Sequence, residues 1–584
     1  MTRKNSALHV LTLVALVLSL MGLVLAGPAQ AAEITFTGTE LLSRPTANSV
    51  SVTIVPDAAI LLYYEYGTTS GVYTEQTATT TATAGTPKTV VIGDLTANTD
   101  YYYRMRYSTD AGANWETRPE YSFHTARAAG NTFTFTITSD SHVNIVMGSA
   151  TTWTNTCNDV AADDPDFHID LGDTVAMRSV DPGDVAGAEA AYEYQLPFFN
   201  IFSASSPVFL VPGNHEQKEG WHVDGTPNDT GPPEDSLPVI GTNAQKKYFP
   251  MPFPDAFYTG DSSTLSYLDG DQLRENYYAW AWGDALFVVI DPFWYTTTKP
   301  YVNDIGGGET NGTGSGDAWS WTLGQTQFDW LKTTLTNSTA AYKFVFTHQL
   351  LTDASLTSQE DYGHAGANHA HMVEWGGNNE APDDSTWAWD TRRAGWGSDP
   401  IHDMMVDAGV SAVFHGHDHQ YAYEQRDGVV YQAIPAAGWG SGGSGFGMYT
   451  TDDGYTIQAL SNCGHLRVTV GPSETTVEYL RTGQTTSSNT YTIEPSEAPV
   501  GVLGEVSGDG FVNSTDALVI LSCDVGLNTS SLCPMNCGDV NSDGVVNSTD
   551  ALVILSYDAG MSVPFPVGQP GCPSSVTPCA GCGP

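Results

Sequence analysis

Five short groups of possible metal ligands follow one another along this chain of 584 residues. They are Asp140-Ser141-His142, Gly172-Asp173, Gly213-Asn214-His215-Glu216, the single residue His348, and Gly416-His417-Asp418-His419. Each group offers carboxylate, amide or imidazole atoms and none contains cysteine, so the set suits zinc, manganese or iron ions better than an iron–sulfur cluster. Together the groups predict a hydrolytic site that holds two divalent metal ions.

A short apolar segment precedes each group, as expected if the ligands lie where β-strands end. The segments are Phe133 to Ile137, where apolar residues alternate with threonine, and Phe167 to Leu171, Pro207 to Val211, Tyr342 to Phe346 and Val410 to Phe414. In open α/β sheets, sites form at the carboxyl ends of strands. Asp140 and His142 are two residues apart, as are His417 and His419, so in an extended chain both members of each pair point to the same side.

The order of these groups resembles that of the calcineurin-like metallophosphoesterase family, over about residues 131 to 490. The resemblance implies an α/β catalytic domain with αββα layers that hydrolyses phosphate monoesters or diesters. It also implies attack by a hydroxide that bridges two divalent transition metal ions, which are zinc, manganese or iron. The residues that match the family's ligands are Asp140, His142 and His419 for one ion, Asn214, His348 and His417 for the other, and Asp173 as the bridge.

His215 matches the family residue that stands outside the metal ligands, meets the substrate phosphate and assists the leaving oxygen. An imidazole ordinarily titrates near neutrality, so it can donate a proton or a hydrogen bond. Glu216 is a candidate to orient it. The purple acid phosphatases of the same family carry a tyrosine ligand three residues after the bridging aspartate. Here that position is Ala176, and His142 would take the coordination position that the tyrosine leaves open. We therefore expect no tyrosinate-to-iron colour.

Other histidines near these groups are interpreted as structural. His168 lies inside an apolar run and is expected to be a hydrogen-bonded core residue. His415 is expected beside the ligands rather than among them. His364, His369 and His371 lie in a glycine- and asparagine-rich stretch, which favours a solvated loop, with a third metal site as the alternative.

The N-terminus has the pattern of a secretory signal peptide over residues 1–31. Arg3 and Lys4 precede an apolar run from Ala7 to Ala26, and Ala29-Gln30-Ala31 offers a cleavage site. We therefore expect a secreted protein, extracellular or associated with the cell surface, with no membrane segment after cleavage; an uncleaved anchor is the alternative. Export permits disulfides among the eight cysteines, which allow 105 full pairings.

The charge of the chain limits its partners. It has 21 basic and 66 acidic residues, a net charge of -45, so its general surface should repel nucleic acid. Such acidity is also compatible with calcium-binding modules or a salty habitat. A phosphate-ester substrate must therefore be attracted by the metal site itself.

Residues 33–127 are predicted to form a separate all-β sandwich. Residues 50–54 and 101–105 alternate between apolar and polar, and residues 60–66 form another apolar run. The stretch from Leu95 to Tyr101 resembles the tyrosine corner of fibronectin type III domains. A sandwich also precedes the catalytic domain in purple acid phosphatases, so we expect a packed partner or spacer without a catalytic role.

The C-terminal segment, residues 503–562, contains two copies of one pattern, 34 residues apart. Each copy predicts a calcium loop followed by a helix, and the pair resembles a type I dockerin, whose family partner is a cohesin module on a scaffold. The residues at loop positions 1, 3, 5 and 12 are Glu505, Ser507, Asp509 and Asp516 in the first copy and Asp539, Asn541, Asp543 and Asp550 in the second. The pairs 514–515 and 548–549 are expected to contact a cohesin-like partner; the alternative is a calcium-stabilised module without one.

The sequence as a whole predicts a multidomain protein: an N-terminal all-β sandwich, a central α/β metallophosphoesterase domain over residues 131–490, and a small α calcium-loop domain of dockerin type. Residues 491–502 are expected to be a linker and residues 563–584 a cysteine-rich tail. The predicted function is that of a secreted dinuclear phosphoesterase anchored through its dockerin-like module. The alternative is a non-catalytic surface or scaffold-associated protein that keeps the phosphoesterase fold.

Overall fold

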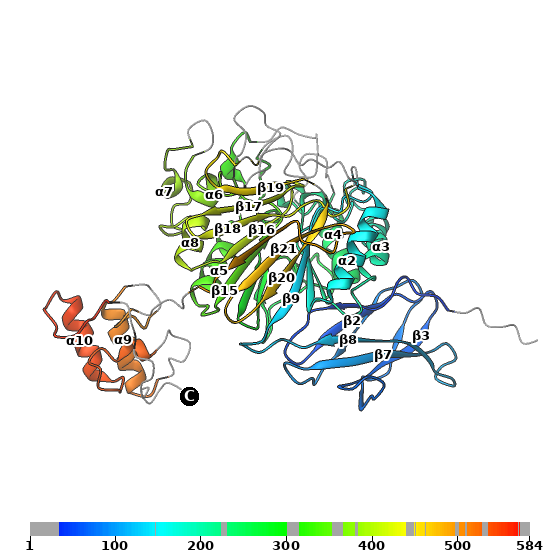
Figure 1. Cartoon of the computed structure of the whole chain (residues 1–584), viewed down its shortest axis with the longest axis horizontal. Helices are drawn as coiled ribbons and strands as arrows, with labels where there is room; N and C mark the ends of the chain where they lie inside the picture. Colours follow the sequence, from blue (N-terminus) through cyan, green and yellow to red (C-terminus); the bar gives the residue numbers. More distant parts are fainter. Residues whose placement is uncertain are drawn as a thin grey trace, which may run out of the picture.

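The computed structural model describes residues 34–145, 148–223, 231–300, 315–352, 366–379, 384–439, 449, 451–461, 463–496, 502–507, 511–527, 535–569 and 572. The predicted signal peptide, His364, Asp509 and most of the cysteine-rich tail lie outside these ranges. Figure 1 shows an N-terminal β-sandwich, a large central domain and a small helical C-terminal domain. Within the described ranges, no helix combines the length and the apolar character that a membrane span requires.

The N-terminal unit is a β-sandwich, as predicted. One sheet contains β1 (Leu41–Ser43), β2 (Val50–Ile54) and β6 (Lys88–Ile92), and the other contains β4 (Glu75–Gln76), β3 (Ile60–Gly67), β5 (Thr80–Ala82), β7 (Asp100–Ser108) and β8 (Glu116–His124). Buried residues alternate along β3 and β7, so one face of this sheet contributes to a core shared with the other sheet. The Tyr101 hydroxyl accepts a hydrogen bond from the Thr96 backbone N–H at 3.0 Å, the type of contact that defines a tyrosine corner. Membership of the fibronectin type III family stays a prediction.

Two β-sheets form the middle of the central domain. The first, in the order β11-β10-β9-β20-β21-β22, contains β9 (Phe133–Thr138), β10 (Phe167–Asp170), β11 (Val208–Leu210), β20 (Gly464–Val470), β21 (Thr475–Arg481) and β22 (Asn489–Ile493). The second, in the order β12-β13-β14-β15-β16-β18-β17-β19, contains β12 (Thr259–Gly260), β13 (Tyr278–Trp282), β14 (Ala285–Val289), β15 (Tyr342–Thr347), β16 (Ala412–His415), β17 (Tyr421–Arg426), β18 (Val429–Ala433) and β19 (Thr456–Leu460). Strands β9, β10 and β11 are mutually parallel, as are β14, β15, β16 and β18.

Helices cover the outer faces of both sheets. The first sheet packs with α2 (Ala150–Asp163), α3 (Val185–Phe199) and α4 (Leu237–Tyr248), and the second with α5 (Gly324–Thr336), α6 (Val373–Gly376), α7 (Trp389–Arg392) and α8 (Ile401–Asp407). In β15, Phe344 and Phe346 face the space between the sheets whereas Val345 faces the helices. The resulting αββα layers confirm the predicted fold class.

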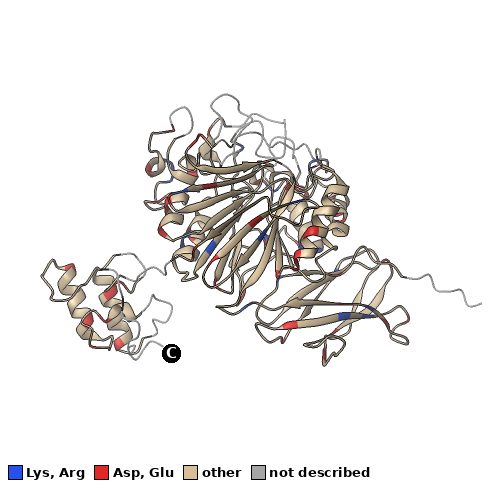
Figure 2. Ribbon diagram, viewed as in Figure 1, with Lys and Arg blue, Asp and Glu red and all other residues tan. Residues whose placement is uncertain are grey.

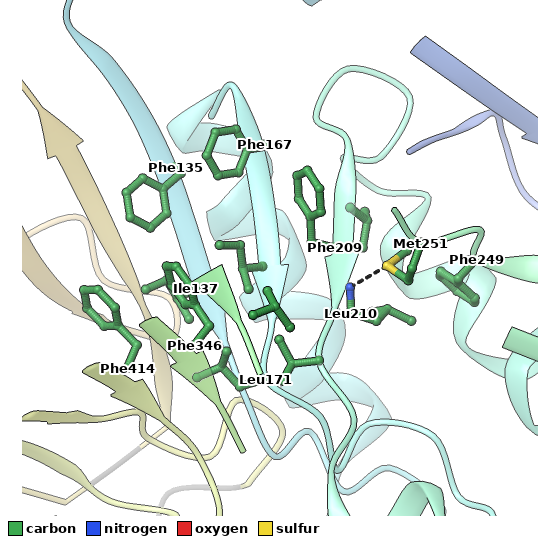
Figure 3. Close-up of a cluster of buried hydrophobic side chains, with 14 of the residues drawn as sticks. Phe135, Ile137, Phe167, Leu171, Phe209, Leu210, Phe249, Met251, Phe346 and Phe414 are labelled. Atoms are coloured by element: carbon green, nitrogen blue, oxygen red, sulfur yellow. Dashed lines mark hydrogen bonds between the residues drawn. The ribbon is translucent and has the colours of Figure 1, made fainter. Parts of the chain in front are cut away.

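Aromatic side chains fill the space between the two sheets. Phe135 of the first sheet packs edge-on against Phe287 of the second, with ring centroids 5.1 Å apart. Phe346 and Phe414, on neighbouring strands, stack at 5.3 Å, and Figure 3 shows them with Phe135 in one cluster. Such pairs add to the large hydrophobic gain from burying each ring. This packed layer fixes the strand ends from which the candidate ligands extend.

The sandwich packs directly on the central domain, which fits the expected role of a packed partner. The Tyr103 hydroxyl donates to the Ala204 carbonyl at 2.7 Å, and Arg44 forms an ion pair with the buried Glu275 at 2.6 Å. At the other end of the domain, β22 extends to Ile493, three residues into the predicted linker. Tyr491 stacks on Tyr423 with centroids 3.9 Å apart, and this contact holds the end of the strand in the sheet.

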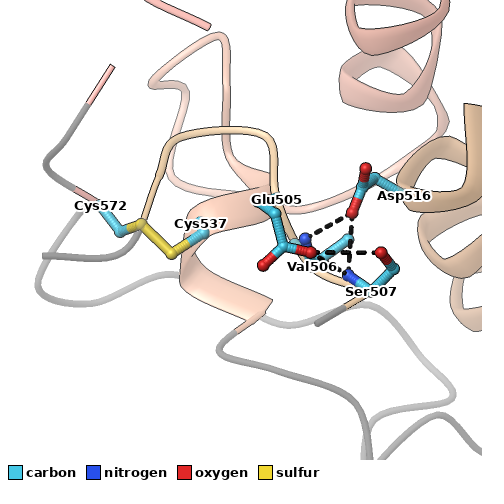
Figure 4. Close-up of a disulfide and its surroundings, with 6 residues drawn as sticks. All are labelled: Glu505, Val506, Ser507, Asp516, Cys537 and Cys572. Carbon is cyan, nitrogen blue, oxygen red and sulfur yellow. Dashed lines mark hydrogen bonds between the residues drawn. A yellow bond between two sulfur atoms is a disulfide. The ribbon is translucent and has the colours of Figure 1, made fainter. Parts of the chain in front are cut away.

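The described part of the C-terminal domain contains two similar helices, α9 (Ser514–Asp524) and α10 (Ser548–Asp558), with the short η5 (Met535–Gly538) between them. Each begins at an asparagine whose side chain accepts from the second helical N–H, while an aspartate three residues later accepts from the asparagine's own N–H. A disulfide joins Cys537 to Cys572, beside the first calcium loop (Figure 4). The thiols of Cys157 and Cys463 in the central domain are buried, and neither belongs to a disulfide in the described part of the chain.

Candidate metal centre

The predicted ligands gather at the carboxyl ends of parallel strands, as expected. Asp140 follows β9, Asp173 follows β10 and Asn214 follows β11, while His348 follows β15 and His417 follows β16. Because these five strands run parallel to their neighbours within each sheet, the loops that follow them meet at one edge. The two sheets therefore present the five ligand groups to one another across this edge.

The first cluster contains Asp140, His142, Asp173 and His419, all buried, with one ligand atom from each residue within 4.8 Å of the others. The Nε2 atoms of His142 and His419 lie 2.9 Å apart. Asp140 Oδ1 lies 3.4 Å from Nε2 of His142 and 3.3 Å from Nε2 of His419. Two imidazoles and two carboxylates thus converge on one point.

The second cluster contains Asp173, His348 and His417, again buried and within 4.8 Å of one another. Asp173 Oδ2 lies 3.4 Å from Nε2 of His348, which is 2.9 Å from Oδ1 of Asn214. Asp173 belongs to both clusters, so the structure brings all seven predicted ligands together and puts Asp173 between the two sets. That these residues hold metal stays a prediction.

The donor atoms fit divalent cations. His348 Nδ1 donates to the Leu171 carbonyl at 2.8 Å, which in the neutral ring leaves the Nε2 lone pair directed at the Asn214 oxygen. Two acceptors in such contact require a proton or a cation between them. In the first cluster, Asp140 Oδ1 is buried without a hydrogen-bond partner. Imidazole, carboxylate and amide oxygen are ligands that zinc, manganese and iron accept.

The electrostatics of the site also fit a metal centre. Burial opposes the ionised form of Asp140, yet His419 and His142 outweigh it and hold the pKa of Asp140 below its ordinary value. Burial also opposes charge on the imidazoles, but Asp140 and Asp173 raise the pKa of His142 to about 9, and Asp173 raises that of His348 to about 10. A field that attracts protons this strongly also attracts metal cations.

Five of the ligand residues have left-handed backbone conformations, which corrects the expectation of an extended chain at the paired ligands. Their φ angles are 54° at Asp140, 51° at His142, 55° at Asp173, 68° at His417 and 57° at His419. Each such residue costs about 1–3 kcal/mol. Hydrogen bonds between the loops hold them: the Asp140 N–H donates to the Gly172 carbonyl at 2.9 Å, and the His417 N–H to Asp140 Oδ2 at 3.0 Å.

Glu216 connects two ligand loops, a role that the sequence did not indicate. Its buried carboxylate accepts hydrogen bonds from the backbone N–H groups of Gly213 at 2.8 Å, Asp173 at 3.0 Å, Thr174 at 3.0 Å and Val175 at 2.8 Å. This role corrects the expectation that Glu216 orients the His215 ring, because both carboxylate oxygens accept hydrogen bonds from backbone N–H groups. Glu216 thereby fixes Asp173 relative to Asn214.

Replacing Glu216 with glutamine should weaken the site without removing a ligand. One carboxylate oxygen becomes an NH₂ group that faces backbone N–H donors, so we expect a loss of about 1–3 kcal/mol in the free energy of unfolding. Metal affinity should fall by about 10- to 100-fold. Denaturant unfolding and metal titration measure the two effects. Glu189→Gln, which breaks only the ion pair with Lys247, serves as the control. Normal metal affinity in Glu216→Gln would contradict the role.

His215 lies beside Asp173 but belongs to neither cluster. Its Nε2 is 3.7 Å from Asp173 Oδ2, and its backbone N–H donates to Asp173 Oδ1 at 2.8 Å. Burial lowers the pKa of His215 to about 4, although the Asp173 carboxylate opposes the shift. The expectation of titration near neutrality therefore does not hold in the free protein, where His215 is a neutral hydrogen-bond donor.

His168 and His415 lie as expected. Hydroxyl oxygens of Thr136 and Thr138 each lie 2.8 Å from a ring nitrogen of the buried His168, and burial lowers its pKa to about 3. His415 Nδ1 lies 3.7 Å from a carboxylate oxygen of Asp418, and His415 belongs to neither cluster. Of the histidines considered for a third metal site, the described His371 lies 3.7 Å from Asp384 and belongs to neither cluster.

The calcium-loop residues occupy two similar turns. In the second loop, Asp539 Oδ1 accepts from the Asp543 N–H at 3.1 Å and Asp550 Oδ1 from the Asn541 N–H at 3.2 Å. The first loop differs: Glu505 Oε1 accepts from the Ser507 N–H at 3.0 Å, and Asp516 Oδ1 from the N–H groups of Val506 and Ser507, each at 2.8 Å (Figure 4).

Comparison with known families decides the identity of these regions. The calcineurin-like phosphoesterase family matches residues 133–421. The chain carries a calcineurin-like phosphoesterase domain. The dockerin type I family matches residues 503–557. The phosphoesterase and dockerin domains predicted from the sequence are therefore both confirmed.

Solved structures share this fold at low sequence identity. The structure of PhoD is 15% identical with a TM-score of 0.53, over 78% of this chain and 88% of that one. Purple acid phosphatase PPD1 from yellow lupin (Lupinus luteus) seeds is 13% identical with a TM-score of 0.50, over 78% of this chain and 74% of that one. A sequence search of curated proteins found no match. At such low identity, these likenesses concern the fold alone.

Proposed function

We propose that the chain is a secreted phosphoesterase that hydrolyses phosphate monoesters or diesters with two divalent transition metal ions. The observation that carries the proposal is the shared position of Asp173, whose carboxylate belongs to both buried clusters. A carboxylate has two oxygens and can bridge two cations. Asn214 adds a neutral oxygen to the second cluster, so it contributes no charge that would repel a phosphate.

Bound by these residues, the two ions would supply a water nucleophile of lowered pKa and offset negative charge on the phosphate. The protein's own contribution is orientation. The His215 backbone N–H donates to Asp173 Oδ1 at 2.8 Å, so the imidazole keeps a fixed place beside the bridging carboxylate. From there, neutral His215 can donate a hydrogen bond to a phosphate oxygen or to the leaving oxygen.

Metal analysis followed by a substrate panel tests the proposal. We expect about two transition metal ions per chain and hydrolysis of at least one class among p-nitrophenyl phosphate, bis(p-nitrophenyl) phosphate, nucleotides and sugar phosphates. Asp140→Ala is the matched inactive variant, because it removes a first-cluster ligand. A protein that binds two ions and hydrolyses none of these esters would favour the alternative, a non-catalytic protein that keeps the fold.

Secretion is proposed from the signal pattern in residues 1–31. Expression of the full chain in a secreting host should yield a mature protein that begins after Ala31, as intact mass measurement would show. Recovery of the unprocessed chain in the membrane fraction would support the uncleaved anchor instead.

We also propose that the dockerin domain docks onto a cohesin-like module of a scaffold. The exposed large apolar side chains of this domain are Phe511, Leu518, Leu521, Val525, Leu527, Val545, Leu552, Leu555, Tyr557 and Met561. The segment 501–584 contains no Lys or Arg, and Figure 2 shows only acidic charge on its helices. Exposed apolar side chains that gather on one domain are a feature of partner-binding sites.

Equivalent residues of α9 and α10 are exposed to the same degree: Leu518 to 63% and Leu552 to 64%. A test of docking must therefore change both. Binding to a recombinant type I cohesin, measured by calorimetry, should be lost in the double variant Leu518→Asp/Leu552→Asp and kept in the control Ile457→Asp, which alters an exposed apolar residue of the phosphoesterase domain. Unchanged binding by the double variant would contradict docking through these helices.

The two calcium loops should differ in affinity. Position 1 is Asp539 in the second loop but the longer Glu505 in the first, and position 3 is Asn541 against Ser507, a weaker oxygen donor. In the first loop, Glu505 already folds back to accept the Ser507 N–H at 3.0 Å. Calorimetry with calcium should show a larger loss of affinity for Asp539→Ala than for Glu505→Ala; equal losses, or the reverse order, would refute the asymmetry.

A further inference from the structure

Trp439 lies against two residues of the first cluster. Its ring centroid is 4.6 Å from that of His419 and 6.1 Å from that of His142. The two imidazoles are themselves perpendicular, at 87°, with centroids 4.5 Å apart. Only 9% of Trp439 is exposed. The indole therefore forms one wall of the first cluster, whereas none of its ring contacts in the described part of the chain involves His348 or His417.

The backbone holds Trp439 in this place through contacts with the loop that carries Asp140 and His142. Residues 436–439 continue from β18 of the second sheet and run beside the end of β9. The Ala437 N–H donates to the Ser139 carbonyl at 2.8 Å, and the Ser149 N–H to the Gly438 carbonyl at 2.8 Å. A Cβ atom at Gly438 would lie 2.0 Å from the Ser141 carbonyl oxygen, so only glycine permits this approach.

We propose that Trp439 is a positioning residue for the first metal: it fixes the ring orientations of His142 and His419 and so sets the affinity of the first cluster, but not that of the second. The proposal rests on the assignment of these histidines as ligands in the proposed function. The reason is geometric. The two Nε2 atoms meet at 2.9 Å only if both rings keep their present rotation, and the indole packs beside both. Groups that orient metal ligands typically change metal affinity by about 10- to 100-fold.

Metal titration of the metal-depleted full chain tests the proposal. We expect Trp439→Ala to weaken binding of one Zn²⁺ ion by about 10- to 100-fold and leave the other unchanged. Trp439→Phe keeps a flat ring in the same place and should retain most of the affinity. Trp396→Ala is the control, since Trp396 is a partly buried ring that packs on Phe328 in a different core. Thermal unfolding of each metal-depleted variant separates loss of affinity from loss of fold.

Adding Trp439→Ala to two variants, each of which lacks one ligand, shows which cluster loses affinity. In a His417→Ala protein, which keeps the first cluster, adding Trp439→Ala should still weaken Zn²⁺ binding; in a His142→Ala protein it should have no effect. Equal weakening in both backgrounds, or a Trp439→Phe variant no better than Trp439→Ala, would show a general packing role and overturn the proposal. If neither His142→Ala nor His417→Ala lowers the Zn²⁺ stoichiometry, the ligand assignment itself is wrong and the proposal falls with it.

Discussion

Replacing Asp173 with asparagine should remove both metal ions and abolish hydrolysis of phosphate esters together. Asp173 is the one residue common to both clusters, and its Oδ2 lies 3.4 Å from His348 Nε2 and 3.5 Å from His142 Nε2. Asparagine keeps the shape but loses the charge and one of the two ligand oxygens. Loss of a residue that only supports a metal ligand typically lowers activity by about 10- to 100-fold. Because Asp173 is itself a proposed ligand of both clusters, we expect turnover to fall by more than that.

Metal analysis and turnover of the same preparations measure the effect. Asp163→Asn is the control, because Asp163 is a mostly buried carboxylate that pairs with His465 and Arg467 outside both clusters. Thorough metal depletion of the unaltered protein should reproduce the Asp173→Asn result, and restoration by Zn²⁺, Mn²⁺ or Fe²⁺ should identify the metal. Undiminished hydrolysis after depletion would show that the nucleophile does not depend on metal.

The placement of the ligands was predictable because each one follows a strand. Alternating residues such as Phe133 and Phe135 identify β9, and continuous apolar runs identify strands that are buried on both faces, such as β11. Once these strands are parallel, their carboxyl ends meet, and Asp140, Asp173 and His348 converge without further information. Local pattern and general topology were sufficient for this part of the site.

The loop conformations were not predictable in the same way. Left-handed φ angles usually indicate glycine, yet here they occur at Asp140, His142 and His417. They are held by bonds between loops that are distant in sequence, such as the one from His417 N–H to Asp140 Oδ2. No local signal specifies such a bond, so spacing suggested an extended chain.

Residues that support the ligands were missed for a related reason. Glu216 is adjacent in sequence to His215, which suggested that it orients that ring, but its oxygens accept backbone N–H groups from both ligand loops. Trp439 lies within a glycine-rich stretch, residues 438–447, whose sequence has no periodic pattern of a strand or a helix. Its contact with His142 crosses almost three hundred positions of sequence and depends on how the two sheets pack.

His215→Ala should lower turnover by about 10²- to 10⁴-fold, the usual effect of losing a positioned acid or base, while the metal content stays normal. His215 Nε2 is directed toward Asp173 at 3.7 Å, yet His215 is a member of neither ligand cluster. Because burial keeps the free imidazole neutral, with a pKa of about 4, its contribution is a hydrogen bond that strengthens as charge develops on the phosphate or the leaving oxygen.

Because the loss of turnover comes from a missing hydrogen bond, its size should depend on the leaving group. An alkyl alcohol needs a donor as the bond breaks, whereas p-nitrophenolate leaves readily without one, so the loss in His215→Ala should be larger for alkyl phosphates. His215→Asn, whose amide N–H can still donate, should lie between His215→Ala and the unaltered protein. Both variants should bind as much metal as the unaltered protein. A fall in metal content would instead make His215 a ligand, and equal losses for both leaving groups would show that its hydrogen bond goes to the phosphate alone.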